Sequence, residues 1–366
     1  FFTSISKAIR MVSIKRCLKV VGLTLAAALW AHISLSLTLV YLASANFDVR
    51  GPNLRKFDFN LNPPETNSAF QFLQPQHNFS ESLELNYAYL RHRWSGTAKD
   101  QRILFLGSSV TWGYPMQASA SLSGAYQKLV GSEGVIASAA VIGGSLEDSM
   151  QIGCTIASAP KAGTVFLEIP AQNEFLPLVD GEKYTFLRSS DECAELSAKG
   201  STSYLNYFLR TPFGVSLLSR VQPQYPHVTG AEHMSLVIIP DDYVHTVGEF
   251  NAVKKEALIG VNAAIEVAQS VGDKVVAFVS PVYLNGYAEL DKNPAYLQLY
   301  SDMALNACRR HRGVICLDTL NLFAQDVEKF YNVYHLNREG ALALAKYLLS
   351  VAGNTKSNKS LTSSLR

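Results

Sequence analysis

The pattern of apolar and polar positions changes at Arg102. From there, short apolar runs of strand length alternate with longer segments whose apolar residues recur at helical spacing. The predicted strands are 102–108, 134–141, 163–169, 273–280 and 313–317. The predicted helices are 117–131, 146–158, 248–271, 294–311 and 337–351. Runs such as Thr164–Ile169 suit strands covered on both faces. This alternation predicts an α/β fold, a three-layer α/β/α sandwich with a parallel sheet.

One uncharged apolar run, Val20–Ala43, is long enough to cross a bilayer as a helix. Five basic residues come before Asp48, the first acidic residue: Lys7, Arg10, Lys15, Arg16 and Lys19. This basic flank predicts a cytoplasmic N-terminus and a main domain outside the cytoplasm. We therefore expect a single-pass protein of the cell membrane, with a basic cytoplasmic segment at 1–19 and a transmembrane anchor at 20–44.

A cleaved signal peptide is the alternative interpretation of the same segment. Ala43-Ser44-Ala45 has the small-x-small form of a processing site, although the apolar run is longer than a usual signal sequence core. Met11 stands just before the basic stretch and is a candidate start residue.

The rest of the chain divides by composition. Residues 45–100 are rich in Asn, Pro and aromatic side chains, and we interpret them as an extended linker that packs onto the domain. The domain proper covers 101–352 and contains a long insertion at 174–247. The tail 353–366 is rich in Ser, Asn and Lys and is predicted to be disordered.

Composition narrows the class of function. The 366 residues are 48% hydrophobic and 17% charged, enough for a sizeable core. A net charge of +2 does not indicate nucleic-acid binding. The five cysteines, Cys17, Cys154, Cys193, Cys308 and Cys316, show no metal-ligand spacing. Bridges from Cys154 to Cys193 or from Cys308 to Cys316 are possible outside the cytoplasm, and buried free thiols are the alternative.

Candidate chemistry begins where the first predicted strand ends. The turn Gly107-Ser108-Ser109 follows that strand directly, and His335 precedes the last helix. A serine needs a base to act as a nucleophile. Because ligands of open parallel sheets bind beyond the carboxyl ends of the strands, these side chains are expected to meet there. Taken singly, Ser109 also fits a helix N-cap, and His335 also fits a buried, hydrogen-bonded histidine.

Four blocks of sequence resemble the SGNH (GDSL) hydrolase superfamily. The first is Gly107–Gly113, with Ser109 at the nucleophile and Ser108 where Asp is usual. The second is Ser138–Asp148, and the third is Glu168–Glu174. The last, Asn332-Val333-Tyr334-His335, is similar to Asp-x-x-His and is followed by the Leu-Asn-x-x-Gly seen in membrane-anchored and periplasmic relatives of alginate O-acetylation and D-alanyl transfer proteins. The resemblance implies the SGNH, flavodoxin-like form of the α/β sandwich.

The resemblance also implies roles for individual residues. Ser109 is the nucleophile, His335 the general base, and the oxyanion hole is formed by the N–H of Ser109, a glycine at Gly143 or Gly144, and the Asn173 amide. Asn332 occupies the position of the triad acid. An amide cannot stabilise an imidazolium as a carboxylate does. Asp318, after the last strand, is therefore a possible substitute acid, and a Ser-His dyad or a degenerate site are the other two possibilities.

Nearby aromatic side chains complete the prediction for the site. Trp112, Tyr114 and Tyr334 are candidates for stacking on sugar rings, although aromatic residues at such places are also ordinary core. No metal site and no cofactor are expected. A nucleotide site is disfavoured because the chain lacks both a Gly-x-Gly-x-x-Gly fingerprint and a P-loop lysine.

Two functions remain open from the sequence. The first is a membrane-anchored acyltransferase or esterase acting on O-acyl groups, above all O-acetyl, of a cell-envelope polysaccharide. The second is a catalytically degenerate domain that serves as a structural subunit of a larger membrane complex. Either function implies an integral-membrane partner, in the first case a membrane-bound acyltransferase.

Overall fold

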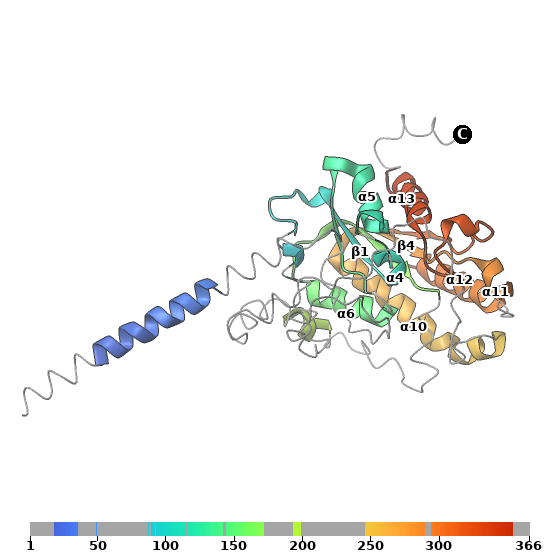
Figure 1. The fold of residues 1–366 in the computed structure, drawn as a ribbon. Coiled ribbons are helices and arrows are strands. Elements are labelled where there is room, and N and C mark those ends of the chain that lie inside the picture. The colour runs from blue at the N-terminus through green and yellow to red at the C-terminus, as the bar shows by residue number, and fades with distance from the viewer. Residues whose placement is uncertain are drawn as a thin grey trace, which may run out of the picture.

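The structure is a computed structural model of the 366-residue chain. It describes residues 18–35, 49, 87, 89–91, 93–114, 116, 118–141, 144–171, 193–198, 246–289 and 294–353. These residues include a separate N-terminal helix and an α/β domain (Figure 1).

One parallel sheet of five strands forms the centre of the domain. The strands are β1 (Arg102–Leu106), β2 (Val135–Ser138), β3 (Ala162–Ile169), β4 (Gly272–Val279) and β5 (Val314–Leu317). Their spatial order is β2-β1-β3-β4-β5, and each neighbouring pair is parallel. The chain thus runs from β1 to one side of the sheet and then returns past β1 to the other side. The fold class predicted from the alternating pattern is confirmed.

Side chains alternate between the two faces of the sheet, so each strand contributes to two cores. Phe105, Phe166 and Phe278 belong to one core, where Phe105 stacks on Phe166 with ring centroids 4.7 Å apart. Leu104 and Val165 belong to the other core. Because both faces are covered, the strands are apolar runs rather than amphipathic ones.

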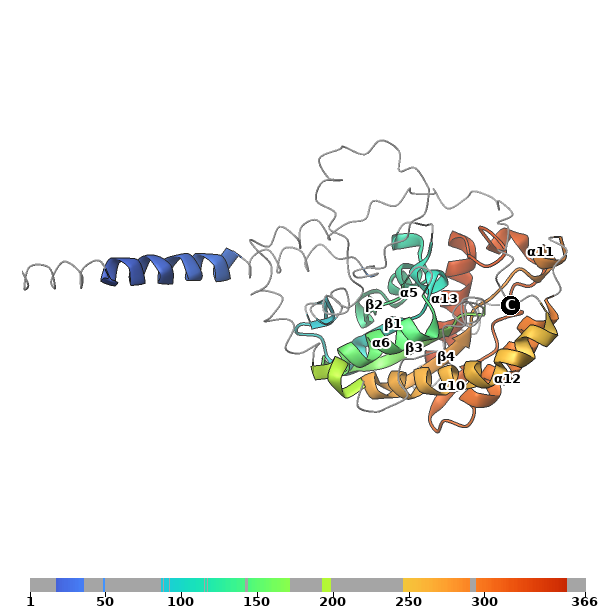
Figure 2. The same ribbon diagram turned by 90° about the horizontal axis from the view of Figure 1, so that it is seen from below.

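Helices cover both faces. α5 (Leu122–Val130) and α13 (Arg338–Gly353) pack together on one face. α6 (Leu146–Ile156), α10 (Val247–Val271) and α12 (Ala295–Cys308) cover the opposite face, with α10 between the other two (Figures 1 and 2). Ser145 begins α6 and Thr246 begins α10, each through a capping box that satisfies backbone N–H groups at the helix start.

Several short elements were not predicted as separate elements, and one of them, at 118–120, lies within the predicted helix 117–131. They are the helices α4 (Ser109–Trp112) and α11 (Leu284–Glu289) and the 3-10 turns η1 (Lys99–Gln101), η2 (Ala118–Ala120), η3 (Gly131–Glu133) and η6 (Val327–Lys329). Such elements span at most two turns, too short for a helical period to appear in the sequence.

Part of the segment interpreted as a linker is helical and buried. Tyr89, Leu90 and Trp94 are each 2% exposed or less and join the larger core. The Trp94 indole N–H donates to the Val135 carbonyl (3.2 Å). This segment therefore fastens onto the β2 edge of the sheet.

Two disulfides join elements of the domain. Cys154 on α6 is bonded to Cys193, and Cys308 on α12 is bonded to Cys316 in β5. The sequence left these pairings open against free thiols. Cys17 lies outside the described residues.

The N-terminal helix Leu18–Leu35 is long and apolar enough to cross a membrane, with a mean hydropathy of 1.6 and no side chain buried inside the protein. Residues 36–44 of the predicted anchor, the tail beyond 353 and most of the insertion 174–247 lie outside the described residues.

At the start of α13 the backbone of Gly340 packs directly against the backbone of Lys329, and a substitution can test this contact. A Cβ on Gly340 would overlap the carbonyl oxygen of Lys329 in the segment before His335. We expect Gly340→Ala to lower the free energy of unfolding by about 1–3 kcal/mol, the usual cost of overpacking. Chemical denaturation of the full chain in detergent measures the change. Gly248→Ala is the matched control, because its Cβ would meet only the Thr246 hydroxyl, at 3.9 Å. Equal stabilities for the two variants would contradict the prediction.

Candidate active site

The site lies at the carboxyl edge of the sheet, between β1 and β3. The chain leaves β1 toward β2 on one side and later places β3 on the other side, so the two strands flank the point where the topology reverses. In open α/β sheets this is the position at which ligands bind. The segments that follow β1, β3 and β4 all meet there.

Ser109 is the first residue of α4, directly after the turn that ends β1. Its side chain is buried, with 6% of the residue exposed. Gly113 ends this short helix in the left-handed region at φ 85°, and its N–H donates to the Ser109 carbonyl (2.8 Å). Only a residue without Cβ adopts this φ without strain. Ser109 is thus held in a single compact turn.

His335 contacts Ser109 although the two residues are 226 positions apart in the sequence. Its Nε2 lies 2.8 Å from Ser109 Oγ, and its Nδ1 lies 3.1 Å from Asn332 Oδ1. The three residues therefore form a chain of hydrogen bonds in which the predicted nucleophile, base and orienting residue occupy the expected order.

The partners of Asn332 fix the tautomer of His335. Asn332 Oδ1 also accepts from the backbone N–H groups of Tyr334 (3.1 Å) and His335 (2.8 Å). Backbone N–H groups only donate, so the atom that faces them is the amide oxygen. An oxygen can only accept from Nδ1, which places the ring proton on Nδ1. The lone pair of Nε2 is then left to accept from the Ser109 hydroxyl.

A second asparagine holds this loop in place. Asn337 Oδ1 accepts from the N–H groups of Glu339 and Gly340 (3.0 Å each) at the start of α13. Its Nδ2 donates back to the Glu328 carbonyl (2.6 Å). The Asn of the pattern Leu-Asn-x-x-Gly therefore links the segment around His335 to the beginning of α13 by hydrogen bonds.

The prediction of Asp318 as a substitute acid is not supported. Asp318 Oδ1 accepts from Ser301 Oγ (3.4 Å) and from the Leu320 N–H (3.3 Å). Because Asn332 occupies the Nδ1 side of His335, no carboxylate takes that position among the described residues.

The structure describes two of the four residues predicted to form the oxyanion hole, Ser109 and Gly144. The Ser109 N–H has no hydrogen-bond partner among the described residues, as expected of a first-turn donor that is open to a ligand. Of the two glycines that the sequence left open, Gly144 donates its N–H to the Val141 carbonyl (2.9 Å). A Cβ there would also lie 2.8 Å from that carbonyl oxygen, which explains the glycine by space alone. Gly143 and Asn173 lie outside the described residues.

Two tyrosines flank the imidazole. The rings of Tyr114 and Tyr334 lie 5.2 Å and 4.7 Å from the His335 ring, centroid to centroid. Burial lowers the pKa of His335 from 6.5 to about 3, so its ring is neutral near neutral pH. Burial, and secondarily the neighbouring Tyr331, raise the pKa of Tyr114, which therefore stays protonated. Trp112 does not share the predicted role, because it is only 3% exposed and packs against Ala140.

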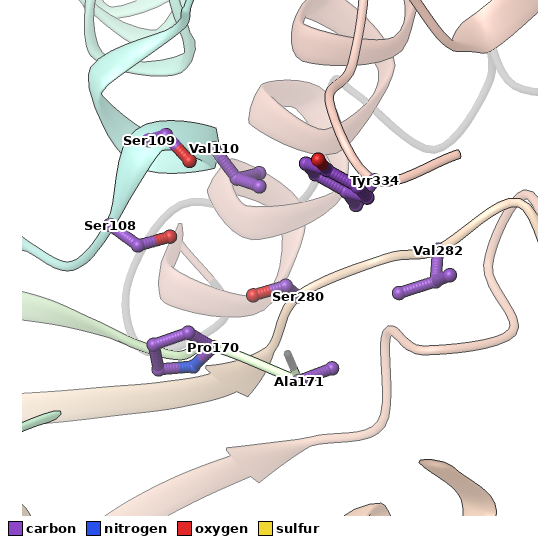
Figure 3. Close-up of a pocket in the computed structure, with 8 residues that line it drawn as sticks. All are labelled: Ser108, Ser109, Val110, Pro170, Ala171, Ser280, Val282 and Tyr334. Carbon is purple, nitrogen blue, oxygen red and sulfur yellow. The ribbon is translucent and has the colours of Figure 1, made fainter. Parts of the chain in front are cut away.

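A small pocket opens beside Ser109 (Figure 3). Its lining comes from Ser108, Ser109 and Val110 after β1, Pro170 and Ala171 after β3, Ser280 and Val282 after β4, and Tyr334. The cavity volume is about 20 Å³. One water-sized group needs roughly 10–15 Å³ by the same measure, so the pocket has room for one group of about that size.

Glu168 is a site residue to which sequence reasoning gave no role. It is fully buried at the end of β3 and bonds the turn that carries Ser109. A charged residue inside a strand that is covered on both faces is the signal that could have identified it. No cluster of three metal-ligating side chains occurs within the described part of the chain.

Comparisons with known proteins give structural matches only. No family model and no curated protein matches the sequence. A family two carbohydrate esterase from Clostridium thermocellum is 12% identical, with a TM-score of 0.37 over 69% of this chain and 64% of that one. Axe2, an acetylxylan esterase from Geobacillus stearothermophilus, is 13% identical, with a TM-score of 0.38 over 69% and 94%. A carbohydrate acetylesterase family member from Sinorhizobium meliloti is 11% identical, with a TM-score of 0.35 over 69% and 97%.

The low pKa of His335 has a consequence for stability. As the pH falls from about 6.5 to about 3, the unfolded chain binds a proton at His335 that the folded protein does not. Stability should therefore decrease toward acid, by up to about 1.4 kcal/mol per pH unit from this residue alone. Denaturation of the wild type and of His335→Asn at several pH values measures the effect. The Asn variant, which keeps a donor toward Asn332, should show a shallower slope. Identical slopes would contradict the assignment, as would an NMR titration of His335 near pH 6.5.

Proposed function

We propose that this protein is an SGNH-type serine esterase or acyltransferase that acts on small O-acyl groups, above all O-acetyl, of a cell-envelope carbohydrate. The observation that supports the proposal best is the hydrogen bond of 2.8 Å between Ser109 Oγ and His335 Nε2, with Nδ1 of the same ring held by Asn332. In acyl transfer by serine enzymes, the serine hydroxyl is the nucleophile, and the neutral imidazole that accepts its hydrogen bond at Nε2 is the general base.

The proposed reaction proceeds in two halves. His335 Nε2 takes the proton of Ser109 as Oγ attacks the carbonyl carbon of the ester. The tetrahedral intermediate collapses, the sugar alkoxide leaves with the proton from His335, and the acyl group stays on Ser109. Water or a second sugar hydroxyl then attacks the acyl-enzyme and gives its proton to His335. The acyl group passes to that oxygen, and Ser109 recovers its proton.

The negative charge of the intermediate needs donors. The Ser109 N–H is open among the described residues, and a backbone donor at the start of a helix suits an oxyanion. We assign the other two donors to Gly143 and the Asn173 amide. A donor of this kind is worth about 3 kcal/mol of transition-state stabilisation.

The pocket supports a short acyl group. Val110, Ala171 and Val282 contribute apolar lining, and the volume of about 20 Å³ suits the methyl group of an acetyl ester. Tyr114 and Tyr334 are partly exposed beside His335 and are therefore placed to contact a sugar ring. Trp112 takes no part in this proposal.

We place the domain outside the cytoplasm, anchored by the helix Leu18–Leu35. The basic N-terminal flank favours this orientation. Two disulfides within the domain support it, because such bonds persist in oxidising compartments. An acceptor sugar held at the membrane, or a membrane-bound acyltransferase as partner, would make the protein a transferase rather than a hydrolase.

A direct test is the hydrolysis of p-nitrophenyl acetate by the full chain in detergent. We expect a rate that falls by at least about a thousandfold in both Ser109→Ala and His335→Ala, because the two residues act as one unit. A fluorophosphonate probe should label the wild type and not Ser109→Ala. Folded wild-type protein that shows neither turnover nor labelling would instead favour the structural subunit, an interpretation that Asn332 in place of the usual acid supports.

Asn332 offers a second test of the mechanism. Because the Asn332 amide already sets the tautomer, Asn332→Asp would add only the charge that stabilises the imidazolium. We expect turnover to rise about 10- to 100-fold, less than the roughly 10⁴ that separates Asp from Asn where the amide also sets the wrong tautomer. The gain should appear in kcat for p-nitrophenyl acetate. Asn332→Ala is the control and should lose activity, whereas an unchanged rate in both variants would argue against any role for this residue.

A further inference from the structure

Glu168 is a fully buried carboxylate next to the candidate nucleophile. It is the second-to-last residue of β3 and lies against Gly107 in the turn after β1. A Cβ on Gly107 would come within 2.5 Å of both Glu168 Cβ and Oε2. The glycine of the turn therefore makes room for this carboxylate.

Both oxygens of Glu168 are engaged. Oε2 accepts from the backbone N–H groups of Ser108 (2.9 Å) and Thr111 (3.0 Å). Oε1 accepts from the Ser108 hydroxyl and from Ser280 Oγ (2.7 Å), and the two hydroxyls point toward one another in Figure 3. Four donors match the acceptor capacity of one carboxylate. Within the part of the chain that the structure describes, Glu168 has no basic partner.

These bonds hold the residues on both sides of Ser109. Ser108 precedes α4 and makes no capping bond with its own side chain. Glu168 caps the helix in its place, from a strand 60 residues later in the chain. The turn is thus fixed at Ser108 and at Thr111, and the Ser109 N–H between them is left open.

The same contacts explain a departure in the sequence. The superfamily that the chain resembles has Asp at the position of Ser108. Here a carboxylate still meets this turn, but it comes from β3, and Ser108 donates to it rather than carrying it.

We propose that Glu168 is a positioning residue that holds the turn of Ser109 at a fixed distance from His335 and keeps the Ser109 N–H open for the oxyanion. This inference rests on the proposed function. It requires the acceptor atoms of Glu168 and not its charge. Misplacing a reacting group by about 1 Å costs on the order of 100-fold in rate. Loss of the Glu168 hydrogen bonds to Ser108 and Thr111 should therefore lower kcat.

The test compares Glu168→Gln with Glu168→Met in the full chain. The Gln oxygen accepts from both N–H groups, and its NH₂ donates to the two hydroxyls, which rotate to accept. Met has a similar length but accepts nothing useful. For p-nitrophenyl acetate we expect Gln to stay within about fivefold of the wild type, and Met to lose about 100-fold in kcat with little change in KM. A Met variant with the wild-type kcat, or an equal loss in Gln and Met, would overturn the proposal.

A control separates positioning from simple loss of stability. Leu348→Ala removes a fully buried side chain of α13. It lies about 15 Å along the helix from the end near His335. It should lower the stability of the domain, because it leaves a cavity in the core. Its kcat should remain that of the wild type at a temperature where it is folded. A kcat loss in Leu348→Ala as large as in the Met variant would assign the effect to stability and overturn the proposal.

Amide hydrogen exchange gives a readout that does not depend on activity. The N–H groups of Ser108 and Thr111 should exchange slowly in the wild type and in Glu168→Gln, and much faster in Glu168→Met. If the wild type hydrolyses no ester but this pattern of exchange holds, the proposed function fails, whereas the positioning of the Ser109 turn by Glu168 is supported. If exchange is equally slow in all three proteins, Glu168 does not hold the Ser109 turn and the proposal is wrong.

Discussion

The site depends on the parallel pairing of β1 with β3. Leu106 pairs with Leu167 in this register, so Gly107 and Glu168 come next to each other at the edge of the sheet. That contact brings a buried carboxylate under the turn that carries Ser109. A shift by one residue would move Glu168 to the other face of the strand and leave the turn without its acceptor. The apolar strands that build the core therefore also set the geometry of the site.

On the opposite side of Ser109, orientation is achieved without charge. Asn332 accepts three hydrogen bonds with one amide oxygen, two from backbone N–H groups and one from His335 Nδ1. In a site where burial lowers the pKa of the imidazole to about 3, a neutral orienting group avoids a further buried charge. In the proposed reaction, this arrangement keeps the productive tautomer but provides little stabilisation for the imidazolium that forms during attack. In the proposed mechanism Asn332 and Glu168 thus divide two tasks: the amide orients His335, and the carboxylate holds the turn of Ser109.

The sequence predicted the fold and the meeting of Ser109 with His335, because apolar strands and the residues after them follow simple periodicity. It could not predict what depends on distances between strands. The bridges of Cys154 and Cys308 were named as candidates, but only the distances in the fold decide between such bridges and free thiols. Whether the N–H of Gly144 is open or already bonded is a property of the turn and not of the residue type. Asp318 follows a strand just as the candidate residues do, yet it bonds Ser301 instead. Glu168 was visible in principle, since a carboxylate in a doubly covered strand needs a reason.

These constraints together narrow the chemistry that suits the site. A base whose pKa lies far below the surrounding pH gains little from proton transfer alone. Most of the stabilisation of the transition state must then come from donors to the oxyanion and from the reactivity of the substrate itself. An ester meets this requirement better than an amide, because its carbonyl is more electrophilic and its alcohol is a better leaving group that depends less on protonation by His335. In the proposed function, the small pocket beside Ser109 suits an acyl group of about the size of acetyl. Burial, a neutral orienting residue and a small pocket therefore favour the same substrates, small O-acyl esters.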